Sequence, residues 1–281
     1  MNLQELELKA NEIRKSLLQT IYDGGTGHTG GALSSADILT ALYYHTLHVD
    51  PANPDAADRD RFILSKGHCV EGYYAILADK GFIPKEELHT YCRYGTRLIG
   101  HPNNEIPGIE VKTGALGHGL PVGTGMAIGL KKNNSNGRVF VLMGDGEQEE
   151  GSVWEAAMAG SHYKLDNLTG IVDRNHLQIS GTTEEVIGLE PFADRWRAFG
   201  WAVREIDGND MEQLVAAFDA LPLEKGKPSL IIAHTVKGRG VKEMENRKEW
   251  HHGVPDAALL QSAFAQLDEQ AANIIKEGVS L

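Results

Sequence analysis

A Gly-Asp-Gly turn between two apolar strands is the feature that most constrains how this chain can fold. Residues 138–143 read Arg-Val-Phe-Val-Leu-Met, which predicts a buried strand, and the turn at 144–146 follows directly. A predicted helix and a second apolar strand come next, and Asn175 lies just beyond that strand. In a βαβ unit both strands end at the same edge of the sheet, so Asp145 and Asn175 are expected to converge there.

The oxygen atoms expected at this edge suit a hard divalent cation. A carboxylate, an amide oxygen and backbone carbonyls are donors that Mg²⁺ takes in proteins, with water or phosphate oxygens completing its octahedron. An ordinary βα turn is the plain alternative, because glycine and aspartate are common in such turns. On these residues alone both interpretations stay open.

Strands and helices alternate along the whole chain. This alternation predicts an α/β fold with a mostly parallel sheet and helices on both faces. No internal repeat or linker interrupts it, so residues 1–281 are expected to form one domain. Strands are predicted at 61–65, 138–143, 168–172, 201–206 and 228–233, and helices at 3–21, 34–48, 70–80, 84–94, 120–131, 153–165, 191–199, 211–221 and from 255 onward. The helix over 120–131 holds three glycines, which calls for close packing; a weak loop is its alternative.

Composition removes several classes of function. The net charge of −12 and the pI of about 5.4 argue against nucleic acid or a membrane surface as the main partner. With two cysteines, no signal peptide and no apolar run of about 20 residues, the chain is expected to be cytoplasmic. P-loop, His-Glu-x-x-His and Gly-x-Ser-x-Gly motifs are absent from the sequence. Any bound phosphate must then be held by helix dipoles, a metal or histidines.

Histidines recur in loops that can reach the same sheet edge. His68 follows the strand at 61–65 and precedes a helix, where the helix dipole favours an anion. His28 lies in a glycine-rich loop that matches the dinucleotide fingerprint, but this match follows a helix instead of a strand and is rejected. His101 and the pair at 251–252 are further candidates. Taken singly, each histidine is more simply a solvated surface residue, and no pair has regular zinc-ligand spacing.

Together these motifs resemble the transketolase family. The Gly-Asp-Gly turn followed by Asn175 resembles the motif that binds thiamine diphosphate and its metal. Other segments occur in the family's order: Gly27-His28, 57–62, Ser65 to His68, Gly100 to Pro102, Thr113 to Gly119, and His252-Gly253. The similarity covers only the family's first domain, so the chain resembles the N-terminal, diphosphate-binding subunit of a split transketolase. It departs from the family at Ala115, where proline is usual, and at His118, where glutamine is common.

The resemblance implies a role for each matching residue. Mg²⁺, or Ca²⁺ or Mn²⁺ in its place, would be held by Asp145, Asn175 and the carbonyl of Leu177. Thiamine diphosphate would be contacted by His68, Gly114, Ala115, Leu116, Gly146, Asn175 and His252. His28, His101 and His252 would face the reacting ketose and assist proton transfers. The implied reaction moves a two-carbon ketol unit from a ketose phosphate to an aldose phosphate.

The resemblance also implies a partner. The family's glutamate that activates the aminopyrimidine ring, and the sites that bind the sugar phosphate, have no counterpart in this sequence. A separate C-terminal subunit, carrying the pyrimidine-binding and C-terminal domains, is expected to supply them in an α₂β₂ assembly. The sequence leaves open whether the sugars belong to pentose phosphate metabolism or to a branched-sugar or sulfosugar pathway. The α subunit of a 2-oxo acid decarboxylating dehydrogenase shares the metal motif and is the alternative, although the histidines favour transketolase; a non-catalytic binding protein that has kept the fold is a more distant one.

Overall fold

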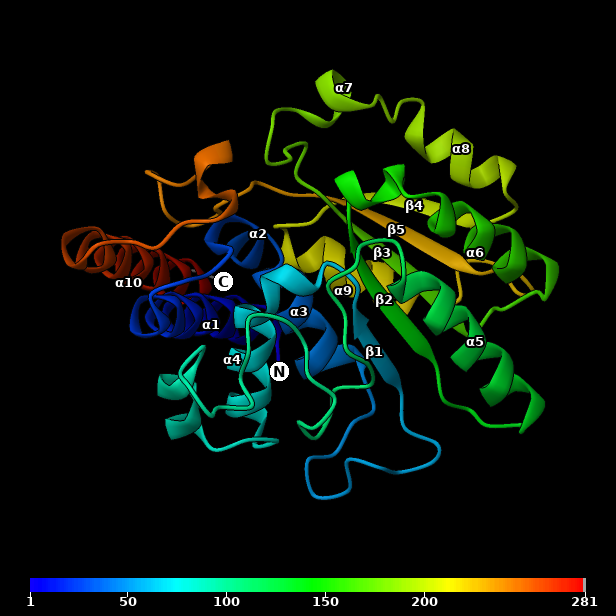
Figure 1. Ribbon diagram of the computed structural model, residues 1–281, viewed down its shortest axis with the longest axis horizontal. Coiled ribbons are helices and arrows are strands. Elements are labelled where there is room, and N and C mark those ends of the chain that lie inside the picture. The colour runs from blue at the N-terminus through cyan, green and yellow to red at the C-terminus, as the bar shows by residue number, and fades with distance from the viewer. Residues whose placement is uncertain (280–281) are drawn as a thin grey trace.

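One parallel sheet forms the centre of the molecule (Figure 1). The computed structural model describes residues 1–279, and within them five strands pair in the order β1-β2-β3-β5-β4. The strands are β1 (Arg61–Leu64), β2 (Val139–Gly144), β3 (Leu168–Arg174), β4 (Ala202–Asp207) and β5 (Ser229–His234). Every pairing among them is parallel, so the predicted sheet is confirmed. Gly144 of β2 lies opposite Asp173 of β3, which brings the ends of these two strands together.

Helices cover both faces of the sheet, as the sequence predicts (Figure 1). Among the described residues, no helix combines the length and the apolarity needed to cross a membrane. The longer helices are α1 (Leu3–Gly24), α4 (Val70–Lys80), α5 (Gly119–Lys132), α6 (Gly151–His162), α9 (Met211–Asp219) and α10 (Ala257–Val279). The shorter ones are α2 (Thr29–Ser34), α3 (Ala36–Ala41), η1 (Leu42–Thr46), η2 (Gly67–Cys69), η3 (Lys85–Thr90), η4 (Gly146–Glu149), α7 (Thr183–Val186), α8 (Phe192–Ala198) and η5 (Lys248–His251).

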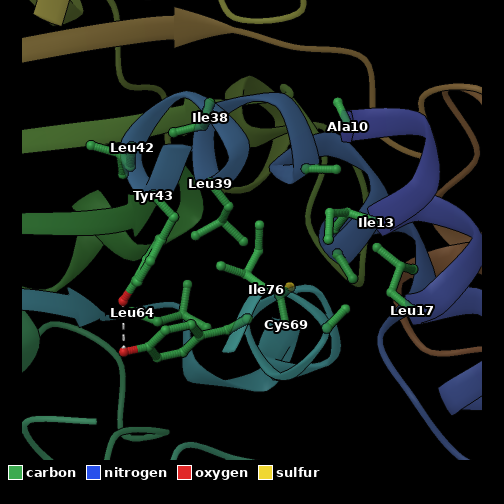
Figure 2. Packing of buried hydrophobic residues seen from close by; sticks show 14 of the residues in the cluster. Ala10, Ile13, Leu17, Ile38, Leu39, Leu42, Tyr43, Leu64, Cys69 and Ile76 are labelled. Carbon is green, nitrogen blue, oxygen red and sulfur yellow. Dashed lines mark hydrogen bonds between the residues drawn. The ribbon is translucent and has the colours of Figure 1, made fainter. Parts of the chain in front are cut away.

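Two hydrophobic cores lie on opposite faces of the sheet because successive strand residues point to opposite sides. On β2, Phe140 and Leu142 join the core under α1, α3, α4, α9 and α10, whereas Val141 and Met143 join the core under α5, α6 and α8. Figure 2 shows part of the first core, where Leu17 of α1 and other buried side chains of α1, α3 and α4 gather. These two layers fix the strands, and with them the loops at the carboxyl edge.

The segment after α1 differs from the prediction. Helix α2 begins at Thr29, where a loop was expected, and Ser35 separates it from α3. The single helix expected over 34–48 is observed as α3 followed by the π-helix η1. The hydroxyls of Ser34 and Ser35 both donate to the carbonyl of Gly31 instead of capping a helix, and Ser34 also donates to the buried carboxylate of Asp173 (2.7 Å). Satisfying that buried carboxylate is worth more than a helix cap. Because α2 follows a helix, the rejection of the dinucleotide match stands.

The glycine-rich helix α5 is confirmed, and the loop alternative is wrong. A Cβ atom at Gly123 would lie 2.6 Å from Cγ2 of Val141, so this glycine allows the helix to approach β2 closely. The other two glycines, Gly125 and Gly129, have open space where a Cβ would be. Close packing therefore explains one of the three interior glycines.

Candidate functional site

Polar residues follow the strands at the carboxyl edge of the sheet. Lys66 and His68 come after β1, Asp145 directly follows β2, Asn175 directly follows β3, and Lys237 comes after β5. Ligands of parallel α/β sheets bind at this edge, because the loops there converge and the strands hold them rigidly. The predicted strand-end residues thus share one region of the fold.

Asp145 is a deeply buried carboxylate. Its side chain accepts hydrogen bonds from the backbone amides of Gly146 (2.8 Å) and His176 (2.6 Å), and Arg174 lies 3.5 Å away. Burial, reinforced by the nearby Asp173 carboxylate, raises the pKa of Asp145 to about 6. A bound cation would offset this cost of keeping the carboxylate charged, so the position suits a metal.

Asn175 and Leu177 place two further oxygens in the next loop. The side-chain oxygen of Asn175 accepts from the amide of Leu177 (3.2 Å), and the carbonyl of Leu177 accepts from Nζ of Lys237 (3.0 Å). A cation at the Leu177 carbonyl would therefore have to displace a flexible ammonium group. Among the described residues, no group of three or more His, Cys, Asp or Glu side chains is placed to hold a metal. The carboxylate, the amide and the carbonyl fit the hard-oxygen chemistry of Mg²⁺.

The histidines expected at the site form a cluster around His28. Its ring centroid lies 4.8 Å from that of His252, 5.0 Å from His68, 5.7 Å from His251 and 6.5 Å from His101. The structure therefore brings together all five histidines named from the sequence, although they come from four separate segments. We call these five residues the histidine cluster.

Four of the five rings in the cluster, those of His28, His68, His101 and His251, have a lowered pKa. Burial, with smaller contributions from His252, His101 and Lys237, lowers the pKa of His28 to about 4. Burial and the Lys66 ammonium lower the pKa of His68 well below its ordinary value, and burial also lowers the pKa of His101. A neutral imidazole has one donor and one acceptor nitrogen, so each ring can give a proton on one side and accept one on the other.

Gly114 lies directly against the cluster. Its φ of +149° is rarely adopted by residues with a side chain, and a Cβ there would lie 2.7 Å from Cδ2 of His101. Thr113 anchors this loop by donating to the carbonyl of Leu64 at the end of β1 (2.7 Å). The glycine thus lets the loop backbone touch an imidazole.

The remaining predicted cofactor residues are less tightly placed. Ala115 is exposed, and the carbonyl of Leu116 lies 3.0 Å from Nδ1 of His118. A Cβ at Gly146 would lie 2.9 Å from the side chain of Gln178, which comes from the loop after β3.

A buried ion pair beneath the site was missed by the sequence reasoning. Nζ of Lys66 contacts the carboxylate of Asp173, and both side chains are almost fully buried. Burial alone would raise the pKa of Asp173, but the ammonium holds it below its ordinary value. The pair joins the end of β1, which carries His68, to the end of β3, which carries Asn175. The available signal in the sequence was Asp173, a charged residue near the end of an otherwise apolar strand.

Lys237 was also missed as a site residue, and His251 was named as a candidate without an assigned role. Nζ of Lys237 lies 3.1 Å from Nδ1 of His251 and donates to the carbonyl of Leu177, so it connects the loop after β3 to the histidine cluster. The ring of His251 stacks on His68 at 5.3 Å. The Lys-Gly-Arg-Gly segment after β5 was visible in the sequence, but nothing in its spacing assigns the lysine a partner.

Glu147 was missed as well. This buried carboxylate accepts from the hydroxyl of Ser65 and from the amides of Gly117 (2.9 Å) and Gly144 (3.0 Å). Burial raises its pKa despite these donors. Glu147 thereby ties together the ends of β1 and β2 and the loop before α5.

Comparison with known proteins places this geometry in a family. The family model described as transketolase, thiamine diphosphate binding domain, matches residues 6–271. One of the subunits of apulose-4-phosphate transketolase from Phocaeicola vulgatus is 51% identical over 277 residues, covering 99% of both chains. One of the subunits of 6-deoxy-6-sulfo-D-fructose transketolase from Clostridium sp. is 40% identical, covering 97% of this chain and 100% of that one.

Solved structures agree with this assignment. Transketolase from Campylobacter jejuni has a TM-score of 0.84 and 28% identity, over 98% of this chain and 48% of the other. The chain thus spans about half the length of the solved transketolases that it matches. Because these similar proteins are named as transketolases, the 2-oxo acid dehydrogenase alternative is not favoured. The chain belongs to the transketolase family and corresponds to its thiamine-diphosphate-binding part.

Proposed function

We propose that this chain is the diphosphate-binding half of a split transketolase that transfers a two-carbon ketol unit between sugar phosphates. The observation that carries the proposal is the convergence of the histidine cluster with the oxygens of Asp145 and Asn175 at one sheet edge. Similarity along the full length of proteins that are named as single subunits of apulose-4-phosphate transketolase supports it. In this proposal residues 1–281 act as a single diphosphate-binding domain.

Mg²⁺ would be held by Asp145, Asn175 and the Leu177 carbonyl, with Ca²⁺ or Mn²⁺ as substitutes. A metal suits this acidic chain because it neutralises phosphate charge where local lysines are few. Lys237, displaced from Leu177, would remain within reach of the same anionic group. The cofactor contacts would come from His68, Gly114, Ala115, Leu116, Gly146 and His252.

When bound, thiamine diphosphate would supply the carbanion chemistry that ketol transfer requires. The chain's own contribution would be orientation and proton movement. His28, His101 and His252 would hold the hydroxyls of the sugar and pass protons, because neutral imidazoles can both donate and accept. The low pKa of His28 means that this ring is neutral across the physiological range.

A second chain would complete the site. It would supply the glutamate that activates the cofactor and the residues that bind the sugar phosphate, in an α₂β₂ assembly. Both cysteines of this chain are free, which suits a reducing cytoplasm. The mass of the reconstituted complex, measured by light scattering, checks the assembly: a mass of two copies of each chain is expected, and a 1:1 complex would contradict it.

The substrate follows from assays with the reconstituted complex. Relatives that are 51% and 43% identical are named for apulose 4-phosphate, so this ketose is the first donor to test, and 6-deoxy-6-sulfofructose is the second. We expect transfer of a two-carbon unit to an aldose phosphate and no decarboxylation of pyruvate. Decarboxylation without ketol transfer would reverse the proposal in favour of a 2-oxo acid dehydrogenase component.

A further inference from the structure

Helix α4 carries a buried carboxylate that the proposed mechanism does not use. Glu71 is fully buried in the first turn of the helix. Its Oε1 accepts a hydrogen bond from the backbone amide of His28 (2.9 Å) and another from the hydroxyl of Tyr91 (2.9 Å). Its other oxygen, Oε2, has no hydrogen-bond partner among the described residues. Such a group is costly to bury, so its contacts should stabilise a specific arrangement of the chain.

The loop before His28 is shaped around this carboxylate. A Cβ at Gly27 would lie 2.8 Å from Oε1 of Glu71, and a Cβ at Gly24 would lie 2.6 Å from Cδ1 of Tyr91. The backbone between α1 and α2 therefore lies directly on Glu71 and Tyr91. Any shift of the carboxylate has to move the amide of His28.

One turn along the same helix, Tyr74 holds a second member of the cluster. Its hydroxyl donates to the carbonyls of His101 (2.8 Å) and Ile99 (3.0 Å). Residues three apart on a helix lie on the same face, so Glu71 and Tyr74 point toward neighbouring loops. Helix α4 also follows directly after the short helix η2, which contains His68. A single rigid helix is thus connected to three histidines of the cluster.

We propose that Glu71 is a positioning residue for His28, acting through the His28 amide and the Tyr91 hydroxyl, and that Tyr74 positions His101 in the same way. Neither residue touches the reacting atoms in this arrangement. Their effect is to fix how the two imidazoles are aimed relative to each other. A displacement of about 1 Å at a reacting group can lower a rate by roughly 100-fold, so such fixing matters for turnover.

The surroundings of Glu71 support a role in geometry. Burial raises its pKa to about 7, while the His28 amide, the Tyr91 hydroxyl and the Lys66 ammonium act in the opposite direction. Hydrogen bonds to an ionised acceptor are stronger and shorter than neutral ones. The two donors on Oε1 therefore favour the carboxylate that holds the loop.

The test compares Glu71→Leu, which removes the acceptor, with Glu71→Gln, which keeps an acceptor oxygen. In complex with the partner subunit, we expect Glu71→Leu to lower kcat roughly tenfold while the Kd of thiamine diphosphate changes less than about twofold. Glu71→Gln should lower kcat by less than about threefold. Equal kcat in Glu71→Leu and the wild type would overturn the proposal, as would a parallel loss of cofactor binding.

A second readout does not depend on activity. Imidazole NMR signals of the full chain are recorded, with His28→Asn used to assign the His28 ring. We expect Glu71→Leu to shift the His28 signals and Glu71→Gln to leave them close to the wild type. Unshifted signals in Glu71→Leu would refute the positioning role. This inference rests on the proposed function only for its kinetic readout, so an inactive wild-type complex would refute that function and leave the NMR comparison decisive for Glu71.

Variants that remove a single hydroxyl group complete the test, and they decide it if Glu71→Leu does not fold. Tyr91→Phe removes one donor from Glu71, and Tyr74→Phe releases the His101 carbonyl; both should lower kcat several-fold with little change in cofactor Kd. Tyr43→Phe is the matched control, because its buried hydroxyl pairs with Tyr73 in the core shown in Figure 2. If Tyr91→Phe and Tyr74→Phe behave like Tyr43→Phe in both kcat and the NMR signals, the proposal is wrong.

Discussion

The two sides of the candidate site are built in different ways. On the metal side, Asp145 and Asn175 come from the ends of the neighbouring strands β2 and β3 in one βαβ unit. On the other side, the histidine cluster is assembled from loops spread between His28 and His252. A local unit can be recognised from its own residues, whereas a cluster of distant loops becomes visible only once the fold brings them together.

The two sides also differ in charge. Burial and the nearby Asp173 carboxylate raise the pKa of Asp145, so the metal side disfavours further negative charge. The pKa of His28 is lowered, so the histidine side avoids further positive charge. The Lys66–Asp173 pair and Lys237 lie between them and connect the two. Separate changes to each side should therefore give separable effects.

The largest effect is expected from breaking the buried Lys66–Asp173 ion pair that connects the two sides. Lys66→Met leaves the Asp173 carboxylate buried without its partner and should lower the free energy of unfolding by about 3–5 kcal/mol. Denaturant unfolding monitored by circular dichroism measures this. Lys112→Met removes the same charge from an exposed lysine and should cost little. Comparable losses in the two variants would show that the buried pair does not stabilise the junction.

Loss of the metal side comes next. Asp145→Ala removes the carboxylate of the proposed metal set, so thiamine diphosphate binding with Mg²⁺ should weaken by more than about 100-fold while the protein stays folded. Isothermal titration with the partner present gives the affinity. Glu155→Ala, on the exposed surface of α6, is the control with the same change in charge. Global unfolding of Asp145→Ala would point instead to a structural role.

A change on the histidine side should lower kcat more than it lowers cofactor affinity. His28→Ala is expected to lower kcat by about 100-fold, the usual contribution of a group that moves protons, and to change cofactor affinity much less. Steady-state kinetics and titration of the same protein separate the two quantities. The exposed His162 at the end of α6 provides the control His162→Ala. An unchanged kcat in His28→Ala would remove His28 from the proposed proton transfers.

The smallest effect is an opposite response to pH in the cofactor-free chain. Asp145 in the folded chain keeps its proton up to about pH 6, whereas its pKa in the unfolded chain is about 3.8. Its contribution to the free energy of unfolding therefore falls as pH rises through that window. His28 stays neutral down to about pH 4 in the folded chain, whereas in the unfolded chain it takes up a proton below about pH 6.5. Its contribution to the free energy of unfolding therefore falls as pH falls through that range.

Urea unfolding between pH 4 and 7 measures both contributions. In Asp145→Asn the free energy of unfolding should decrease less than in the wild type as the pH is raised. In His28→Asn it should decrease less than in the wild type as the pH is lowered. If both variants run parallel to the wild type over the whole range, the two sides do not differ in charge as described.

The sequence could predict the sheet and the placing of Asp145 and Asn175 at neighbouring strand ends because their signals are local. The apolar strands around 144–146 and the position of Asn175 define one unit without reference to the rest of the chain. The partners of the serine hydroxyls at 34–35 could not be predicted, because a serine near a helix start has the same pattern whether its hydroxyl caps that helix or, as at Ser34, binds a distant carboxylate. Nor could the sequence distinguish Lys66 from an ordinary surface lysine, since its partner Asp173 lies in another strand.

The histidine cluster was predictable only through the family resemblance. The resemblance assigned a role to His252 and left its neighbour His251 as a candidate without one, although the structure stacks His251 on His68. Glu71 gave no signal either, because a glutamate in the first turn of a helix is ordinary. Its contact with His28 depends on how α4 packs under the loop after α1, and only the folded chain shows that.

The most direct test of the central claim, that this chain is one half of an active site, is ketol transfer measured while the partner subunit is titrated in. With thiamine diphosphate and Mg²⁺ present, we expect no turnover by the chain alone and a rise in activity that saturates at one partner subunit per chain. Full activity of the purified chain without any partner would contradict the claim.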